Sequence, residues 1–235
     1  MMEKVIIATI KSWNIENAQK FKEIYKDCVD VEIVTDHKIL TTEFVQKIKP
    51  KYLFFPHWSY KISADIYENY ECIVFHTGDL PQDRGGSPIQ NQIAKQKYDT
   101  KICAIRVVEG FDEGDIYLKK NVDLSCGTVD DILKNISNIV FSELIPQIIS
   151  KKIIPIQQQG EPSSFKRRTP QMSDLLTCSF EHIQQVYDFV RMLDGEGYPK
   201  AFLETENFRM ELSDARMEDG KCSGRFELTI KNKEE

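Results

Sequence analysis

Strand-like and helix-like segments alternate four times over residues 4–97, and this alternation constrains the fold more than any other feature. The apolar runs KVIIATI, DVEIVT, KYLFFP and CIVFH are short and rich in β-branched or aromatic residues, as buried strands are. A segment with helical spacing follows each run, and the last one, SPIQNQIAKQK, carries a proline in its first turn. Short connections between alternating strands and helices predict a parallel sheet covered on both faces.

The pattern changes after residue 98. TKICAIRVVEG and GDIYLKKNVDL alternate apolar and polar residues around FDEG, which predicts an antiparallel hairpin. TVDDILKNISNIVFSELIPQIIS predicts the longest helix, and a proline-bearing connector follows it. We expect an α/β fold with a Rossmann-like, mostly parallel sheet over residues 1–150 and an extended linker over 151–178. A small C-terminal α+β domain with antiparallel strands is expected over 179–235.

Composition restricts the classes of partner. The 235 residues are 41% hydrophobic, enough for a sizeable core, and the formal net charge of −6 comes from interspersed acids and bases. Such a balance predicts neither a nucleic-acid partner nor a membrane surface. The apolar run at residues 5–10 is too short for a signal peptide, and no stretch approaches the roughly 20 apolar residues that span a bilayer. We expect a cytoplasmic protein.

Cysteine spacing argues against a disulfide framework or a structural metal. The six cysteines are scattered without a CxxC pair, and no histidine stands at zinc-ligand spacing from them. We therefore expect reduced thiols and no bound metal.

Two phosphate-binding signatures are absent. The sequence contains no GxxxxGK[ST], and no GxGxxG follows the first strand, which ends at IKSWN instead. These absences argue against a P-loop kinase and a dinucleotide-dependent dehydrogenase.

Polar and aromatic residues gather where the predicted strands end. Ligands of an open parallel sheet bind outside the carboxyl ends of its strands. The residues expected at this edge are Lys11 and Trp13 after the first strand, His57 and Trp58 after the third, His76 on the fourth, and Asp112 in the hairpin turn.

Two motifs resemble one known family. FHTGDLPQDRGGSPIQNQI is similar to the His-x-x-x-Leu-Pro-x-x-Arg-Gly pattern of the formyltransferases that use N10-formyltetrahydrofolate. VEGFDEGDIYLKK is similar to their Gly-Leu-Asp-x-Gly-Asp segment. The spacing from His76 to Asp112 fits this family without a gap. The family includes methionyl-tRNA formyltransferase and the sugar N-formyltransferases.

The resemblance implies an acyl-transfer site. An amine attacks the formyl carbon, so the site needs a donor for the oxyanion and an acceptor for the amine proton. By resemblance, His76 is that donor or base, and Asp112 orients its imidazole. Arg84 would tie the loop down and contribute to substrate binding. The segment from Arg106 through Val108 and Gly110 to Asp112 would contact N10-formyltetrahydrofolate.

One position departs from the family. The catalytic asparagine of the family lies two residues before the histidine, where this chain has Val74. We expect His57 to supply the missing donor, with Thr77 as the second candidate. If neither does, the chain would be a non-catalytic relative that binds folate or a nucleotide sugar.

The tail guides the expected acceptor. It is short, and its basic cluster is limited to Lys166, Arg167 and Arg168. VRMLDGEGYPKAF is similar to the stretch that lines the acceptor groove of sugar N-formyltransferases. The acceptor expected from this resemblance is a UDP-linked 4-amino-4,6-dideoxy sugar, as in the pseudaminic-acid type, with glycinamide ribonucleotide as the alternative. The residues expected to bind it are Lys11, Trp13, Trp58, Thr77, Arg84, Arg191 and Tyr198. The edges of the three C-terminal strands could pair between two copies, so a homodimer is also expected.

Overall fold

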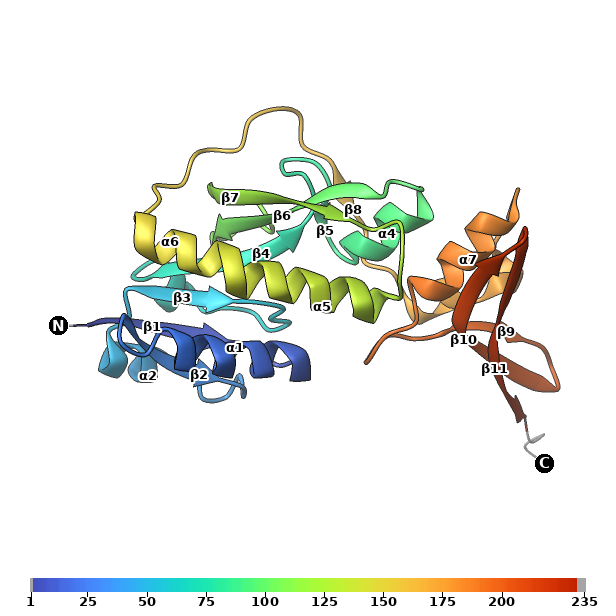
Figure 1. Ribbon diagram of the computed structural model, residues 1–235, viewed down its shortest axis with the longest axis horizontal. Coiled ribbons are helices and arrows are strands. Elements are labelled where there is room, and N and C mark those ends of the chain that lie inside the picture. The colour runs from blue at the N-terminus through green and yellow to red at the C-terminus, as the bar shows by residue number, and fades with distance from the viewer. Residues whose placement is uncertain (1, 232–235) are drawn as a thin grey trace. The chain divides into compact units, whose positions relative to one another are not determined.

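The computed structural model describes residues 2–231, which form two compact units (Figure 1). The first takes the chain up to Arg84, then Lys101–Val122 and Lys134–Ser164. The second takes Gly85–Thr100, Asp123–Leu133 and the chain from Phe165 onward. These units group the chain differently from the domains 1–150, 151–178 and 179–235, which stay a prediction.

A six-stranded sheet forms the core of the fold, in the order β2-β1-β3-β4-β6-β7. Its strands are β1 (Glu3–Ala8), β2 (Val29–Val34), β3 (Tyr52–Phe55), β4 (Glu71–Thr77), β6 (Asp99–Arg106) and β7 (Ile116–Asp123). β1 pairs in parallel with β2 and β3, and β3 with β4, whereas β6 runs antiparallel to β4. The predicted α/β fold with a mostly parallel sheet is therefore confirmed.

Helices cover both faces of this sheet. On one face, Phe21 of α1 (Ser12–Ile24) lies with its ring centre 6.4 Å from that of Phe141, and Ser137 donates a hydrogen bond of 2.6 Å to Asn14. On the other face, Val45 of α2 (Thr42–Ile48) and Ile66 of α3 (Ala64–Tyr67) pack in one apolar cluster with β1 and β3. The carboxyl ends of the parallel strands stay uncovered by these helices and carry the site residues.

The long helix predicted over residues 128–150 is interrupted. It consists of α5 (Val129–Ile139), a π-helical turn (Val140–Leu144) and α6 (Ile145–Lys151). Pro146 lacks an N–H and cannot continue the regular α-helical ladder, which gives a physical reason for the change of hydrogen-bond pattern just before it. At the other end, Thr128 and Asp131 exchange the reciprocal hydrogen bonds of a helix cap.

The second unit contains helices and a small sheet. Its elements are α4 (Pro88–Ala94), two 3₁₀ turns (Pro170–Ser173 and Leu175–Thr177), α7 (Ile183–Arg191), β9 (Ala201–Glu204), β10 (Phe208–Glu218) and β11 (Lys221–Ile230). The three strands pair antiparallel in the order β11-β10-β9, as predicted. β11 is an edge strand, and the expected homodimer stays a prediction.

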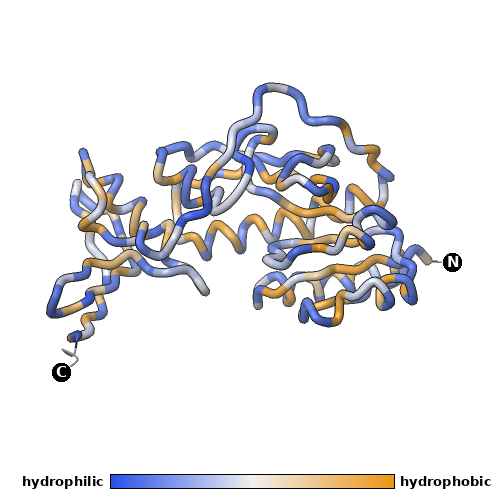
Figure 2. The backbone as a smooth tube through the Cα atoms, turned by 180° about the vertical axis from the view of Figure 1, so that it is seen from behind, coloured by the Kyte–Doolittle hydropathy of each residue, from blue (hydrophilic) through white to orange (hydrophobic). Residues whose placement is uncertain are grey.

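The connector after α6 is largely hydrophilic in Figure 2 and forms little regular structure. A short strand, β8 (Ser164–Phe165), pairs there with β5 (Arg84–Gly85). Among residues 2–231, no helix combines the length and hydrophobicity that crossing a membrane requires.

Candidate active site

His76 on β4 is held at both ring nitrogens. Its side chain is 7% exposed, with Nδ1 3.2 Å from Oδ2 of Asp112 and Nε2 2.7 Å from the backbone carbonyl oxygen of Asp83. The sequence prediction that His76 and Asp112 meet is borne out by this geometry. The Asp83 carbonyl had no counterpart in the sequence analysis.

Both partners of His76 are hydrogen-bond acceptors. A neutral imidazole donates from one nitrogen only, so the two contacts are satisfied together when the ring carries two protons or when Asp112 carries one. The site therefore places an imidazole within 3.2 Å of a carboxylate. Such a pair can stabilise an oxyanion and relay a proton in acyl transfer.

The backbone beside His76 leaves room for no larger residue than glycine. A Cβ on Gly78 would lie 2.9 Å from Nε2 of His76 and 3.0 Å from the carbonyl oxygen of Asp83. Asp83 itself has a positive φ of 62°, which few non-glycine residues adopt. With this backbone conformation, the loop directs the carbonyl oxygen of Asp83 toward the imidazole of His76.

The loop after β4 is fixed by charges. The Asp79 carboxylate lies 2.7 Å from Nζ of Lys119 and 2.9 Å from Nζ of Lys101. Burial alone would raise the pKa of Asp79, but the hydrogen bonds and charges of the two lysines outweigh it and hold the pKa below its ordinary value. Farther along the loop, the backbone N–H of Asp83 donates to Oγ of Ser163 at 3.1 Å.

Gln158 joins the two loops that hold His76. Its side-chain nitrogen donates to the carbonyl oxygens of Asp112 at 2.7 Å and Gly114 at 2.8 Å, and its oxygen accepts a bond of 2.8 Å from Nη2 of Arg84. Asp112 has a φ of 57°, and a Cβ on Gly114 would come within 1.8 Å of the Arg106 carbonyl oxygen. The hairpin turn is therefore a tight structure that Gln158 ties to Arg84.

Sequence reasoning missed Gln158, Ser163 and Asp83. Gln158 and Ser163 lie in the connector, more than 70 residues beyond His76 in the chain, and no local pattern marks them. Arg84 was predicted to hold the loop and to bind substrate. Its guanidinium contacts Gln158 and, at 3.3 Å, Glu113. The loop-holding role agrees with these contacts, and the substrate contact stays a prediction.

A second group of predicted residues meets at the ends of β1 and β3. The ring centres of Trp13 and His57 are 6.1 Å apart, and Nζ of Lys11 lies 5.5 Å from the centre of the Trp13 ring. Trp58 packs edge-on against Phe55 and Tyr60. The indole nitrogens of Trp13 and Trp58 are buried without a hydrogen-bond partner among the described residues. A buried donor without a partner costs free energy, so these two indole N–H groups are unsatisfied in the structure as it stands.

Val74 offers no polar group to this edge. It packs against the apolar clusters on both of its sides, and Phe55 of β3 is its register partner. His76 lies on β4 two residues beyond Val74, and His57 lies two residues beyond Phe55, in the turn after β3, with a φ of 51°. Thr77 ends β4 and is 7% exposed. The roles expected of His57 and Thr77 stay predictions.

The side chain of Arg106 lies away from His76. Nη2 of Arg106 is 2.5 Å from Oε1 of Glu71, and Arg106 pairs in register with Ile73 near the amino end of β4. Since β6 runs antiparallel to β4, the guanidinium points to the end of the strand opposite His76. The folate contact expected of the segment that begins at Arg106 did not concern this side chain, and it stays a prediction. The contacts expected of Val108 and Gly110 stay predictions.

Arg191 cannot reach a substrate. It is 1% exposed, its guanidinium pairs with Asp188 at 2.7 Å, and it donates to the carbonyl oxygens of Leu124 at 2.8 Å and Gly127 at 3.0 Å. Its predicted substrate contact is wrong because the second unit uses all of this side chain internally. Tyr198 also belongs to the second unit, where burial raises its pKa. Its expected role stays a prediction.

Three comparisons relate the chain to known proteins. The family model described as "Methionyl-tRNA formyltransferase, C-terminal domain" matches residues 170–229. A solved structure of methionyl-tRNA formyltransferase from Clostridium thermocellum has a TM-score of 0.94 and 44% identity, over 98% of this chain and 100% of that one. Methionyl-tRNA formyltransferase from Bacillus subtilis is 27% identical over 77% of this chain but only 59% of its own length.

A more distant structure shares the fold alone. HypX from Aquifex aeolicus, solved in complex with tetrahydrofolic acid, has a TM-score of 0.71 and 16% identity over 94% of this chain and 40% of that one.

These findings define a formyltransferase, the enzyme class that the motifs predicted. The chain belongs to the methionyl-tRNA formyltransferase family. The predicted folate co-substrate agrees with this family. The predicted acceptor, a nucleotide-linked amino sugar, is wrong, and so is the exclusion of a nucleic-acid partner, because the relatives are methionyl-tRNA formyltransferases. The prediction relied on overall charge and a short tail, and neither reports a local contact with RNA.

Proposed function

We propose that this chain transfers the formyl group of N10-formyltetrahydrofolate to the α-amino group of methionyl-tRNA. Membership of the family supports the choice of donor and acceptor. The chain spans 59% of the length of the curated Bacillus subtilis relative, so the substrates of that relative are assigned to this chain as a proposal. The observation that carries the reaction type is the His76 imidazole held 3.2 Å from the Asp112 carboxylate.

The transfer forms one C–N bond, from the formyl carbon to the amino nitrogen, and breaks one, from the formyl carbon to N10 of the folate. The amino nitrogen attacks the formyl carbon and gives a tetrahedral centre with a negative oxygen. The bond to N10 of the folate then breaks, the amine loses a proton and N10 gains one. His76 donates to the oxyanion from Nε2, while Asp112 holds Nδ1 and takes part in the proton transfer. In this proposal the formyl oxygen takes the place of the Asp83 carbonyl oxygen, which lies 2.7 Å from Nε2 in the structure.

His57 is our candidate for the donor that Val74 cannot provide. It lies in the turn after β3, next to the carboxyl end of β4 that carries His76, and its ring centre is 6.1 Å from that of Trp13. Losing one oxyanion donor typically costs roughly 10²- to 10³-fold in rate, so a replacement is expected in an active enzyme. Lys11 and Trp13 are proposed to lie against the acceptor, and Val108 and Gly110 against the folate.

The test offers the protein one donor and several acceptors. We would incubate it with N10-formyltetrahydrofolate and methionyl-tRNA, and measure formylmethionine by mass spectrometry after deacylation. Uncharged tRNA and free methionine serve as matched controls. The proposal expects formylmethionine with methionyl-tRNA only. Transfer to free methionine at the same rate would contradict an RNA acceptor, and tetrahydrofolate release without formylmethionine would contradict the proposed transfer.

A further inference from the structure

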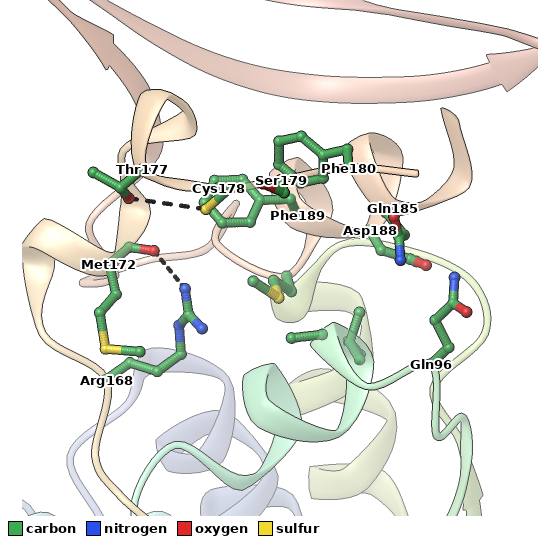
Figure 3. A pocket seen from close by; sticks show the side chains of 13 residues that line it. Gln96, Arg168, Met172, Thr177, Cys178, Ser179, Phe180, Gln185, Asp188 and Phe189 are labelled. Atoms are coloured by element: carbon green, nitrogen blue, oxygen red, sulfur yellow. Dashed lines mark hydrogen bonds between the residues drawn. The ribbon is translucent and has the colours of Figure 1, made fainter. Parts of the chain in front are cut away.

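A cavity of about 370 Å³ lies entirely within the second unit. It is lined by the end of α4, by the stretch from Arg168 to Phe180 and by one side of α7 (Figure 3). Its volume falls within the range of small-molecule binding sites, about 300–1,000 Å³. None of the residues expected from the sequence to act in catalysis or to bind substrate lines it.

Two aromatic rings form one wall. The ring centres of Phe180 and Phe189 are 5.5 Å apart in an edge-to-face arrangement, and both line the cavity. Ile93 and the two methionines Met172 and Met192 complete the apolar surface. An aromatic ligand can pack against either ring of such a wall, face to edge or in an offset stack.

Arg168 places a cation beside the aromatic wall, and Figure 3 shows its side chain among those that line the cavity. Its Nη2 donates to the carbonyl oxygen of Met172 at 2.5 Å, while Nε is buried and has no hydrogen-bond partner among the described residues. No carboxylate of the described residues pairs with this guanidinium. Its carbon lies 6.0 Å from the centre of the Phe189 ring. Burial lowers the pKa of Arg168, and the neighbouring Cys178 offsets this only in part.

The acid in the cavity wall does not neutralise Arg168. Asp188 lines the cavity, but its carboxylate accepts hydrogen bonds from Arg191 at 2.7 Å and Tyr98 at 2.6 Å. A half-buried cation that shares a cavity with an acid already engaged elsewhere favours an anionic ligand. The amides of Gln96 and Gln185 also line the cavity and provide both donors and acceptors.

We propose that this cavity binds a nucleotide, with its base against Phe180 and Phe189 and its phosphate on Arg168. Aromatic walls, a cation and amides are the combination that recognises a base and its phosphate together. Lys166 and Arg167, the exposed residues that precede Arg168 in the chain, do not line the cavity. Nucleotide binding by this cavity does not depend on the proposed function. Only the source of the nucleotide, a unit of the acceptor RNA, rests on it.

The test measures binding of mononucleotides by calorimetry. AMP and CMP are the probes, and adenosine and inorganic phosphate are the controls. Arg168→Gln removes the cation, and Arg167→Gln makes the same charge change at the exposed neighbour. We expect Arg168→Gln to weaken mononucleotide binding by at least about 10-fold, as the loss of a hydrogen bond to a charged group implies, and Arg167→Gln to change it less than about 2-fold. Equal binding by wild type and Arg168→Gln would overturn the proposal, as would phosphate binding as tightly as AMP. Thermal melting shows whether Arg168→Gln is folded, and Phe180→Leu tests the same cavity if it is not.

Cys178 provides a second readout that does not depend on catalysis. It lines the cavity and is partly exposed, whereas Cys28 is an exposed thiol of the first unit. A bound nucleotide slows alkylation of Cys178 by iodoacetamide and leaves Cys28 unchanged, as peptide mass spectrometry would show. Protection by AMP without any formylation of methionyl-tRNA would uphold the cavity and sink the proposed function. Formylation of methionyl-tRNA without protection of Cys178 by AMP or by tRNA would uphold the proposed function and contradict the nucleotide site. Protection of Cys178 by AMP but not by tRNA would show that the cavity binds a free nucleotide and not a unit of RNA.

Discussion

At the scale of single residues, the account rests on an imidazole placed between two acceptors. His76 contacts the Asp112 carboxylate and the Asp83 carbonyl oxygen, and each of these belongs to a loop that other residues hold in place. Gln158 contacts both loops, through the Asp112 carbonyl and through Arg84. We regard Gln158 as a positioning residue for His76.

Replacing Gln158 tests this positioning role. Gln158→Leu removes the donors to Asp112 and Gly114 and leaves their carbonyls unpaired. We expect kcat for formyl transfer to fall on the order of 10- to 100-fold, because small misplacements of reacting groups have effects of this size, while KM for the folate changes much less. Steady-state kinetics would measure both constants.

The neighbouring residue provides the control for this variant. Gln157 is exposed and carries the same side chain, so Gln157→Leu should leave kcat within about 2-fold of wild type. Gln158→Glu keeps an acceptor for Arg84 but places a carboxylate beside two carbonyl oxygens, so it should be as impaired as Gln158→Leu. A wild-type kcat in either Gln158 variant would show that Gln158 does not position His76.

At the scale of elements, the sequence predicted the strands and helices better than the contacts between distant loops. The four parallel strands, β6 and β7, and the three C-terminal strands follow from hydrophobic periodicity and turn residues, which are local properties, whereas the antiparallel direction of β6 relative to β4 was not predicted. The meeting of His76 with Asp112 was predicted through motif spacing. Gln158 was not, because a polar residue in an extended connector takes its role from where the connector passes. Arg191 was misassigned for a related reason: its burial against Asp188 depends on the packing of α7 in the second unit.

The loop after β4 has a predictable pH dependence. The depressed pKa of Asp79 means that its ion pairs with Lys119 and Lys101 stabilise the fold above the ordinary carboxyl value of 3.8. This contribution is lost as the pH falls through the lower pKa of the folded state. Partly exposed ion pairs contribute roughly 0.2–1 kcal/mol each, so the effect is small.

Denaturant unfolding of wild type and Asp79→Asn at several pH values would measure the contribution of these ion pairs to the free energy of unfolding. The difference in the free energy of unfolding should be constant between pH 6 and 7 and should shrink as the pH falls below about 4, since the wild-type carboxylate then takes up a proton. Asp65→Asn alters an exposed acid on α3 and serves as the control. A difference that grows toward acid pH would contradict the ion-pair assignment.

At the scale of the whole molecule, the acceptor could not be deduced from composition. The net charge of −6 argued against RNA, yet the relatives are methionyl-tRNA formyltransferases and the model of their C-terminal domain matches residues 170–229. Charge summed over a chain does not report where cations lie. Arg168 illustrates this, because it lies in a cavity wall without an acidic partner among the described residues.

The rate of formyl transfer by His76→Ala in a single turnover tests the central claim most directly. With methionyl-tRNA and N10-formyltetrahydrofolate, we expect this variant to be slower than wild type by at least about 10²-fold, the typical effect of losing an oxyanion donor. His37→Ala removes a histidine that stacks on Tyr60 at 3.9 Å and should stay within about 2-fold of wild type. A His76→Ala enzyme that transfers formyl groups at the wild-type rate would show that the pair of His76 and Asp112 is not the catalytic centre.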